Sequence, residues 1–487
     1  MLTIRRAVLR TPTLASTTAL RAATPLATRS FSSSTVLDKE KLVILGSGWA
    51  GYNTARKVDK DHYDVTVVSP NNYFSFTPFL ASTCVGTLEF RAATEAVRKL
   101  KHVNYAQGWA DKIDLSNKVV HVAPSLPPYE DPHQTSPHDK NYTSGAEILP
   151  EYTPSDAYHV PYDKLIIATG SRSQSFGTPG VMENANFLKD VREARAIRHR
   201  LLQCLEMAYE PSLSEQERRD ILKFCIVGGG PTGVEFAAEL HDFVHEDVRK
   251  RFPDIADKIE IRLFDVAPGI LMSFDVALRE YAEKKYARDG IKIMPNSKIS
   301  KVDRHALYLD SGERYPFGLL VWSTGVQANE FVNSLQTLQK DDKTHSITVN
   351  EHLQVIDKNS GTVVPNVWAI GDNCTPTTGR LPATAQVAAQ MATYMSKSLN
   401  KLAQGTPVTD LAAFKWKNRG SMVFIGDEKA MVDRSGSSTF RGRVAGFMAW
   451  IMWRSYYMSL ALSPRNKILV PVYWALAWCF GRDIVNF

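Results

Sequence analysis

Short apolar runs recur along this chain, and two of them stop directly at a glycine-rich turn. These runs are 42–45, which ends at Gly46, and 224–227, which ends at Gly228. Runs of this length without polar alternation are typical of strands buried on both faces of a parallel sheet. Further strands are predicted at 65–68, 165–168, 259–264, 319–323 and 367–370. Because helical stretches separate several of these strands, the pattern predicts an α/β fold.

Both turns have the G-x-G-x-x-G spacing of a dinucleotide-binding loop. The first contains Gly46, Ser47, Gly48 and Gly51, and the second contains Gly228, Gly230 and Gly233, about 180 residues later. Glycine permits the tight turn and lets the backbone approach a pyrophosphate at the positive N-terminus of the following helix. One such match is weak, but two in a strand–turn–helix context predict two Rossmann-like domains and two bound dinucleotides.

The two predicted sites differ in the residue that follows the second strand of each unit. Asp265 follows the predicted strand 259–264, where a carboxylate usually holds a ribose hydroxyl. We therefore expect Asp265 to accept from a ribose 2′-hydroxyl and to repel a 2′-phosphate, which favours NADH over NADPH. The corresponding place after 65–68 holds Ser69, so a hydroxyl replaces the acid at the first site.

The composition of the chain indicates a globular protein and suggests where in the cell it is targeted. The 487 residues suffice for two or three domains, and 44% hydrophobic with 22% charged residues is ordinary for a globular protein. Residues 1–37 contain five arginines and no acid, which is typical of a mitochondrial transit peptide. Without them the net charge falls from +7 to about +2. We therefore expect no nucleic-acid binding.

Paired strand-Thr-Gly elements at 165–170 and 319–325 indicate crossover points between an outer domain and a domain inserted within it. We assign 38–190 and 326–410 to the outer domain, 191–325 to the inserted domain and 411–487 to a C-terminal region. The stretch 122–161, rich in Pro, His, Asp, Ser and Tyr, is predicted to be an irregular surface insertion.

The five cysteines are scattered and include no close pair, so a disulfide framework, a zinc site and a redox dithiol are not expected. His241 and His245 have the i, i+4 spacing of a helical zinc pair. They lack a third ligand, and we interpret them as a solvated helix face with no metal.

The last 45 residues form two apolar aromatic runs, 444–462 and 468–480, separated by Pro464, Arg465 and Lys467. Neither run reaches the roughly 18 to 20 uncharged residues that span a bilayer. We expect an amphipathic, membrane-anchoring helical hairpin that lies in the plane of the membrane, without which the nucleotide domains still fold. The alternative is a core helix or a homodimer interface.

These motifs together resemble the type II NADH:quinone oxidoreductases, the single-subunit alternative dehydrogenases of mitochondria, and most closely the internal, matrix-facing fungal enzyme. The resemblance covers about residues 40 to 487. It rests on both glycine turns, on 73–78, 369–373 and 384–388, and on the Trp453-Arg454 pair.

The resemblance implies a glutathione-reductase-like flavoprotein with non-covalent FAD in the outer domain, NADH in the inserted domain and ubiquinone as acceptor. It places the first turn, Thr169, Gly170 and Asp372 around FAD, with Thr77 and Pro78 near the flavin ring. Gly325 is assigned to the nucleotide sites. Glu235, Gln386 and Lys415 are implied to form a catalytic polar network, and Ala385, Gln386 and Tyr457 to line the quinone site. Independently of the resemblance, we expect Glu235 in the first turn of its helix, where the dipole favours an anion.

Two rival functions remain open. A sulfide:quinone oxidoreductase requires cysteines beside the flavin, for which Cys84 and Cys374 are the candidates. A flavoprotein similar to apoptosis-inducing factor requires a basic surface, against which the charge near +2 argues. The leading interpretation is a non-electrogenic NADH:ubiquinone reductase on the matrix side of the mitochondrial inner membrane.

Overall fold

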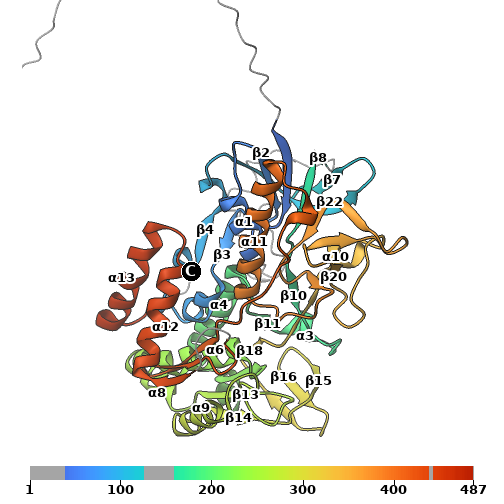
Figure 1. The fold of residues 1–487 in the computed structure, drawn as a ribbon. Coiled ribbons are helices and arrows are strands. Elements are labelled where there is room, and N and C mark those ends of the chain that lie inside the picture. Colours follow the sequence, from blue (N-terminus) through green and yellow to red (C-terminus); the bar gives the residue numbers. More distant parts are fainter. Residues whose placement is uncertain (1–38, 126–157, 438–441, 486–487) are drawn as a thin grey trace, which may run out of the picture. The chain divides into compact units, whose positions relative to one another are not determined.

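The computed structural model describes residues 39–125, 158–437 and 442–485, which excludes the predicted transit peptide and the centre of the predicted insertion. An eight-stranded sheet organises the outer domain, in the order β23-β20-β21-β22-β9-β1-β2-β5. Its strands are β1 (Glu40–Leu45), β2 (Tyr63–Ser69), β5 (Val103–Gln107), β9 (Lys164–Ile167), β20 (Ile347–Val349), β21 (Gln354–Ile356), β22 (Val363–Ala369) and β23 (Cys374–Pro376). The five strands from β22 to β5 are mutually parallel (Figure 1).

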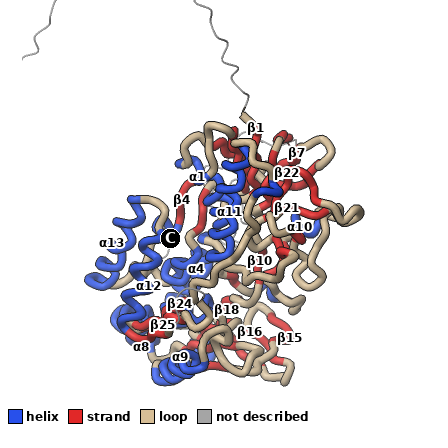
Figure 2. The backbone as a smooth tube through the Cα atoms, viewed as in Figure 1, coloured by secondary structure: helices blue, strands red, loops and turns tan. Residues whose placement is uncertain are grey.

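Helices α1 (Trp49–Lys57) and α11 (Ala385–Ala403) pack against each other beside this sheet (Figure 2). Their contact brings the first turn close to a late segment of the chain. A Cβ on Gly371, just after β22, would lie 3.1 Å from Cβ of Ala50 on α1. The carboxyl ends of β1, β9 and β22 therefore meet at one edge, which is where ligands bind in open α/β sheets.

The inserted domain contains a second, five-stranded parallel sheet in the order β11-β18-β12-β13-β14. Its strands are β11 (Asn186–Phe187), β12 (Lys223–Val227), β13 (Glu260–Phe264), β14 (Lys292–Met294) and β18 (Leu319–Trp322). The helices are α3 (Val181–Asn184), α4 (Val191–Met207), α5 (Glu215–Ile221), α6 (Pro231–Phe243), α7 (Arg249–Arg251), α8 (Pro253–Ala256) and α9 (Val276–Arg288). A π-helical turn at 244–248 joins α6 to α7. Strand β11 joins this sheet although it precedes residue 191.

Short strands complete the two domains. Strands β10 (Ser171–Ser173) and β19 (Val326–Ala328) pair directly after the two predicted crossover points. The remaining elements are β3 (Tyr73–Ser75), β4 (Thr94–Ala96), α2 (Leu80–Cys84), β15 (Ile299–Val302), β16 (Ala306–Leu309), β17 (Arg314–Pro316), α10 (Glu330–Ser334) and the antiparallel β6 (Trp109–Asp114), β7 (Val119–Ala123) and β8 (Tyr158–Pro161). Strands β7 and β8 form the two ends of the segment that we predicted to be irregular, so that prediction is wrong at its ends.

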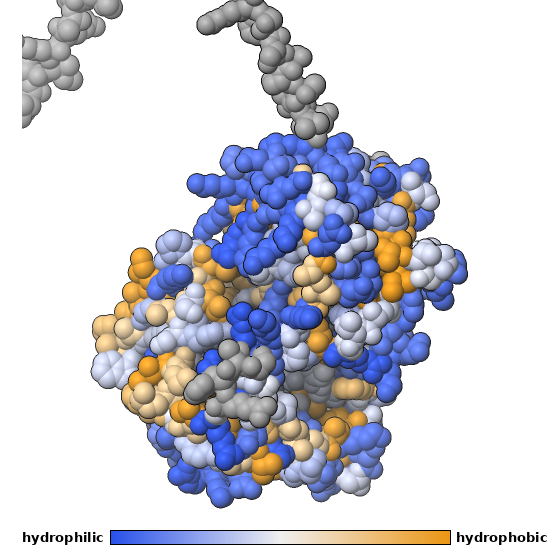
Figure 3. Space-filling model, in the orientation of Figure 1, coloured by the Kyte–Doolittle hydropathy of each residue, from blue (hydrophilic) through white to orange (hydrophobic). Residues whose placement is uncertain are grey.

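The C-terminal region comprises a three-stranded antiparallel sheet and two helices. These are β24 (Ser421–Gly426), β25 (Lys429–Asp433), β26 (Arg443–Gly446), α12 (Phe447–Leu460) and α13 (Pro464–Phe480). One face is buried through Ala449, Trp453, Val470 and Trp474. The other face exposes apolar side chains, among them Ile468 at 66%, Trp478 at 82% and Phe480 at 76% (Figure 3). The hairpin therefore completes the core through one face, and its exposed face is also apolar rather than polar, so the predicted amphipathic pattern is not seen and membrane anchoring stays a prediction.

Arg454 explains how a charge is tolerated within the first apolar run. Its guanidinium lies over the rings of Trp450 and Trp474, 4.0 and 4.4 Å from their centroids. Burial lowers the pKa of Arg454 to about 10. Among the described residues, no helix is long and apolar enough to cross a membrane.

Candidate active site

The first glycine-rich turn links β1 to α1. Gly46 has a φ of +110°, and a Cβ there would lie 2.3 Å from the carbonyl oxygen of Ala168. A Cβ on Gly51 would lie 2.0 Å from the carbonyl oxygen of Gly46, whereas Gly48 faces open space. Close packing therefore requires two of the glycines, and the third leaves room for a ligand at the N-terminus of α1.

The second turn, between β12 and α6, repeats this arrangement. Gly228 has a φ of +113°, and its Cβ would lie 2.6 Å from the carbonyl oxygen of Ser323. A Cβ on Gly233 would meet the carbonyl oxygen of Gly228 at 2.0 Å, and Gly230 faces open space. The two predicted strand–turn–helix units are confirmed. Contacts of their individual glycines with a cofactor stay a prediction, as they do for Gly325.

The two predicted ribose residues both make internal hydrogen bonds. Asp265 accepts from the backbone N–H of Gly229 at 2.5 Å and from that of Ala267 at 2.7 Å. Its carboxylate therefore fixes the second turn, and its predicted contact with a ribose hydroxyl stays a prediction. The hydroxyl of Ser69 is buried and lies 2.9 Å from that of Ser47. This pair ties the first turn to the end of β2.

The carboxyl end of β9 presents an unsatisfied polar group beside the first turn. Thr169 Oγ1 is buried and has no hydrogen-bond partner among the described residues. Its Cα would lie 3.3 Å from a Cβ on Gly46, and the following Gly170 faces open space. An orphaned hydroxyl next to an open glycine fits a dinucleotide that supplies the missing partner. The residues present therefore fit FAD.

Asp372, on the adjacent strand end, is held by neighbours that the sequence did not reveal. Its Oδ2 accepts from the Ser171 hydroxyl at 3.1 Å and lies 3.8 Å from Lys189 Nζ. Burial lowers the pKa of Lys189, while the charge of Asp372 acts in the opposite direction. Lys189 lies outside every motif that we used, so no sequence signal pointed to it.

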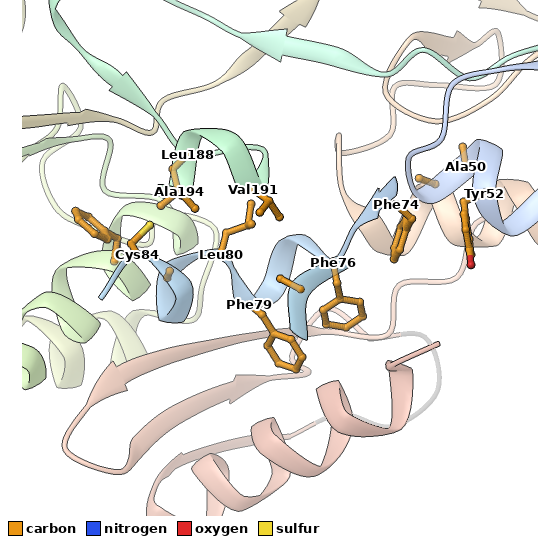
Figure 4. Close-up of a cluster of buried hydrophobic side chains, with 14 of the residues drawn as sticks. Ala50, Tyr52, Phe74, Phe76, Phe79, Leu80, Cys84, Leu188, Val191 and Ala194 are labelled. Carbon is orange, nitrogen blue, oxygen red and sulfur yellow. The ribbon is translucent and has the colours of Figure 1, made fainter. Parts of the chain in front are cut away.

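An aromatic layer connects the 73–79 segment to the C-terminal helices. Trp49 Nε1–H donates to Thr77 Oγ1 at 3.0 Å, next to Pro78. The rings of Phe76 and Phe79 each lie 6.4 Å from that of Tyr457 on α12. Figure 4 shows Phe76 and Phe79 pointing toward the strands and helix of the C-terminal region. The predicted flavin-side residues and the predicted quinone-side Tyr457 therefore belong to one packed layer.

Glu235 is held between α6 and the C-terminal region. Its Oε1 accepts from the backbone N–H of Phe424 at 3.1 Å and from Trp453 Nε1–H at 3.2 Å. Burial raises the pKa of Glu235 to about 8, and these two donors only partly oppose the shift. The predicted place in the first turn is wrong, because α6 begins at Pro231 and its first turn contains no acid. The carboxyl is therefore positioned by hydrogen-bond donors rather than by the helix dipole.

Gln386 lies at the start of α11, directly after Ala385. Its Nε2 donates to the carbonyl oxygen of Gly420 at 3.2 Å, and its Oε1 accepts from the N–H of Arg419 at 3.0 Å. Gln390, one turn later, binds the backbone of Lys417 in the same way, because its Nε2 donates to the carbonyl oxygen and its Oε1 accepts from the N–H. Lys415 is exposed and makes no hydrogen bond or ion pair with Glu235 or Gln386. The structure thus shows no direct polar link among the three predicted network residues.

A buried acidic cluster next to Glu235 was missed. Glu239, one helical turn later, is 5% exposed and accepts from the hydroxyls of Ser82 at 2.6 Å and Thr87 at 2.8 Å. Burial raises its pKa, and the charge of Arg482 lowers it. Arg482 also donates to Thr87 and to Asp247, each at 2.8 Å. The i, i+4 spacing of Glu235 and Glu239 was the signal available in the sequence.

The cysteines do not form a redox pair in the described structure. Cys84, Cys204, Cys225 and Cys374 are buried and free, and Cys479 is exposed. Burial raises the pKa of the Cys84 and Cys374 thiols, which disfavours the thiolate that persulfide chemistry requires.

The predicted His241 and His245 pair stacks with ring centroids 5.9 Å apart. His241, Asp242 and Asp427 have potential ligand atoms within 4.8 Å of one another. Lys285, 1% exposed, lies 3.0 Å from Asp427, so a cation of the chain itself already balances this group.

Comparisons with known proteins agree with this geometry. Residues 40–392 match the pyridine nucleotide-disulphide oxidoreductase family, and 418–483 match the NDH2 C-terminal domain. A probable NADH dehydrogenase of Dictyostelium discoideum is 37% identical over 93% of this chain and 92% of its own length. An internal alternative NAD(P)H-ubiquinone oxidoreductase of Solanum tuberosum is 38% identical over 92% and 88%. The structure of NDH2 from Plasmodium falciparum in complex with NADH superposes with a TM-score of 0.80 at 24% identity, over 92% of this chain and 100% of that chain.

The two-sheet architecture with paired glycine turns defines a pyridine nucleotide-dependent flavoprotein oxidoreductase. Within that class, this chain belongs to the type II NADH dehydrogenase (NDH2) family.

Proposed function

We propose that this protein oxidises NADH and reduces ubiquinone, with FAD as its bound cofactor. The contact of Glu235 with Trp453 carries the proposal, because it joins the helix of the second dinucleotide turn to the C-terminal hairpin. Helix α6, which follows the second glycine-rich turn, thus meets helix α12 of the hairpin at the carboxyl of Glu235. The curated relatives, which are named as NADH or NAD(P)H-ubiquinone oxidoreductases, support the same activity.

The residues around the first turn are proposed to hold FAD. They are Gly46, Ser47, Gly48, Gly51, Ser69, Thr77, Pro78, Thr169, Gly170 and Asp372. Bound FAD supplies the capacity to take two electrons from NADH and to pass them to a quinone. The orphaned hydroxyl of Thr169 supports this assignment, since FAD offers it a hydrogen-bond partner.

The second turn is proposed to bind NADH through Gly228, Gly230 and Gly233, with Gly325 and Asp265 beside it. Gln386, Ala385 and Tyr457 are proposed to line the quinone site. Glu235, whose pKa is about 8, holds a proton at neutral pH near that site. Quinone reduction consumes two protons, so a protonated carboxyl in this place suits the chemistry.

The enzyme is proposed to lie on the matrix side of the mitochondrial inner membrane. The relatives bear mitochondrial names. The exposed apolar face of α12 and α13 supports attachment to lipid, with the aromatic side chains at the depth of the headgroups. A homodimer formed through the same face is the alternative.

Assays of the purified protein with ubiquinone, with sulfide and with no acceptor test the function. We expect rapid NADH oxidation that depends on ubiquinone. Sulfide-dependent quinone reduction, or slow NADH oxidation that ubiquinone leaves unchanged, would contradict the proposal.

A further inference from the structure

A basic cavity adjoins the tip of the C-terminal hairpin. Its volume is about 450 Å³, within the range of about 300 to 1,000 Å³ that is usual for small-ligand sites. Besides Glu95 on β4, three parts of the chain line it. They are the end of α1 with Arg56 and Lys60, the 99–102 segment, and 462–464 between α12 and α13.

The charge of this cavity is strongly one-sided. Arg56, Lys60, Lys99 and Lys101 line it, and none of them forms an ion pair with a carboxylate in the described part of the chain. Burial and the neighbouring Arg56 lower the pKa of Lys60, against the effect of Asp59. Four cations that share one cavity without paired acids repel one another, so an anion bound there would relieve the repulsion.

The lining contains a single acid against these four cations. Glu95 on β4 is 5% exposed and accepts from Asn466 Nδ2 at 2.8 Å. Asn466 also donates to the carbonyl oxygen of Thr94 at 3.2 Å. Glu95 is thus used to fix the first turn of α13 against β4, which lie near each other in Figure 1.

The cavity opens beside the apolar face of the hairpin. Ser463 caps α13, which begins at Pro464, so the positive end of a 17-residue helix adds to the basic lining. Ile468, one turn further along α13, is 66% exposed. An apolar surface that continues into a basic recess matches a phospholipid, whose acyl chains adjoin a phosphate.

We propose that this cavity binds the phosphate headgroup of an anionic phospholipid in the membrane on which the hairpin rests. The inference depends on the proposed membrane attachment of α12 and α13. The phosphate of the headgroup lies among Arg56, Lys60 and Lys99. The acyl chains of the lipid lie along the exposed face of the hairpin.

Flotation of the full chain tests the proposal with vesicles of phosphatidylcholine alone and vesicles that also contain the anionic phospholipid phosphatidylglycerol. The key variant is Arg56→Gln/Lys60→Gln/Lys99→Gln. The matched control removes the same charge from three exposed lysines elsewhere, as Lys284→Gln/Lys301→Gln/Lys343→Gln. We expect the key variant to lose about 100-fold in affinity for the anionic vesicles and the control to lose far less.

A second variant separates a site from diffuse attraction. Leu462→Trp fills part of the cavity without changing charge, and it should also abolish the preference for anionic vesicles. Retention of NADH oxidation with a soluble acceptor confirms that each variant is folded. Equal losses in the key and control variants, or a preference that survives Leu462→Trp, would overturn the site. Displacement of the anionic vesicles from the unsubstituted protein by inorganic phosphate alone would assign the cavity to free phosphate instead.

Binding to phosphatidylcholine vesicles keeps the two proposals distinct. All variants should retain it, because the apolar face of α13 is unchanged. If the unsubstituted protein binds neither kind of vesicle, membrane attachment itself is wrong. If it binds both kinds equally well, attachment stands and the headgroup site is wrong.

Discussion

Trp453 on α12 donates its indole N–H to the carboxyl of Glu235 on α6, at 3.2 Å. The two residues lie 218 positions apart in the chain. The same indole ring packs 5.0 Å from Tyr457. The carboxyl of Glu235 on the helix after the second glycine-rich turn is therefore positioned by a helix of the C-terminal hairpin, which brings the proposed NADH and quinone sides together in space.

The raised pKa of Glu235 predicts a pH dependence. Its carboxyl stays protonated up to a pH of about 8, so quinone turnover should fall as the pH rises through that value. Glu235→Gln should lower turnover about tenfold or more and remove this alkaline limb. Steady-state rates with ubiquinone between pH 6 and pH 9 measure the effect. The exposed Glu280→Gln serves as the control and should keep the limb.

The same shift has a consequence for stability. The folded state binds the proton of Glu235 more tightly than the unfolded state does. The stability that this proton adds to the fold is therefore fully present below the unfolded pKa near 4.5 and is lost by about pH 8. Denaturant unfolding should therefore show a smaller decrease in stability over this range for Glu235→Gln. An identical decrease in both proteins would mean that Glu235 titrates normally.

Gln386 is predicted to act in quinone turnover and not in the reaction with NADH. In Gln386→Ala, stopped-flow reduction of the flavin by NADH should remain fast while ubiquinone turnover falls about tenfold. Tyr457→Ala should behave in the same way. Slow flavin reduction in Gln386→Ala would place Gln386 on the nicotinamide side.

Gln390→Ala provides a control for the structural role of Gln386. Both amides clamp the 417–420 segment to α11. If the loss of turnover in Gln386→Ala arises only from a loosened segment, Gln390→Ala will reproduce it. A selective defect in Gln386→Ala supports contact with the quinone.

Asp265 is predicted to set the preference for NADH over NADPH. Asp265→Asn removes the charge that repels a 2′-phosphate, so the ratio of kcat/KM values for the two nucleotides should narrow by about tenfold. The hydrogen bonds to Gly229 and Ala267 imply that KM for NADH also rises. Exposed Asp254→Asn should change neither quantity. An unchanged ratio in Asp265→Asn would assign discrimination to another residue.

Arg482 is predicted to fasten the C-terminal tail to the core. Its side chain is 8% exposed and pairs with Asp247, which is 7% exposed. Arg482→Ala leaves buried carboxyls without their cation and should cost about 3 kcal/mol or more of stability. Denaturant unfolding measures this loss, and Arg482→Lys should recover part of it. A loss below about 1 kcal/mol would show that the pairing is weak.

Periodicity and glycine spacing were sufficient to predict the two nucleotide units, because buried parallel strands and the turns that follow them are local features. The C-terminal end of the predicted irregular insertion is instead the strand β8, because pairing with β7 imposes strand structure on a polar sequence. The first-turn position of Glu235 was wrong because proline at the first helical position starts α6 at Pro231, four residues before Glu235.

The remaining contacts of the site depend on long-range packing. Glu235 meets Trp453 and Phe424, and Asp372 meets Lys189, only after the domains have folded together. The burial of the hairpin also argues against the expectation that the nucleotide domains fold without it. Trp453 and Val470 are buried in the core, so point substitutions on the exposed face are better tests of membrane attachment than truncation before Val444.

Anaerobic titration of the purified full-length protein tests the central claim most directly. The account predicts one non-covalent FAD per chain whose absorbance bleaches on addition of NADH and returns on addition of ubiquinone. Protein without FAD, or flavin that NADH leaves oxidised, or flavin that ubiquinone fails to reoxidise, would contradict it.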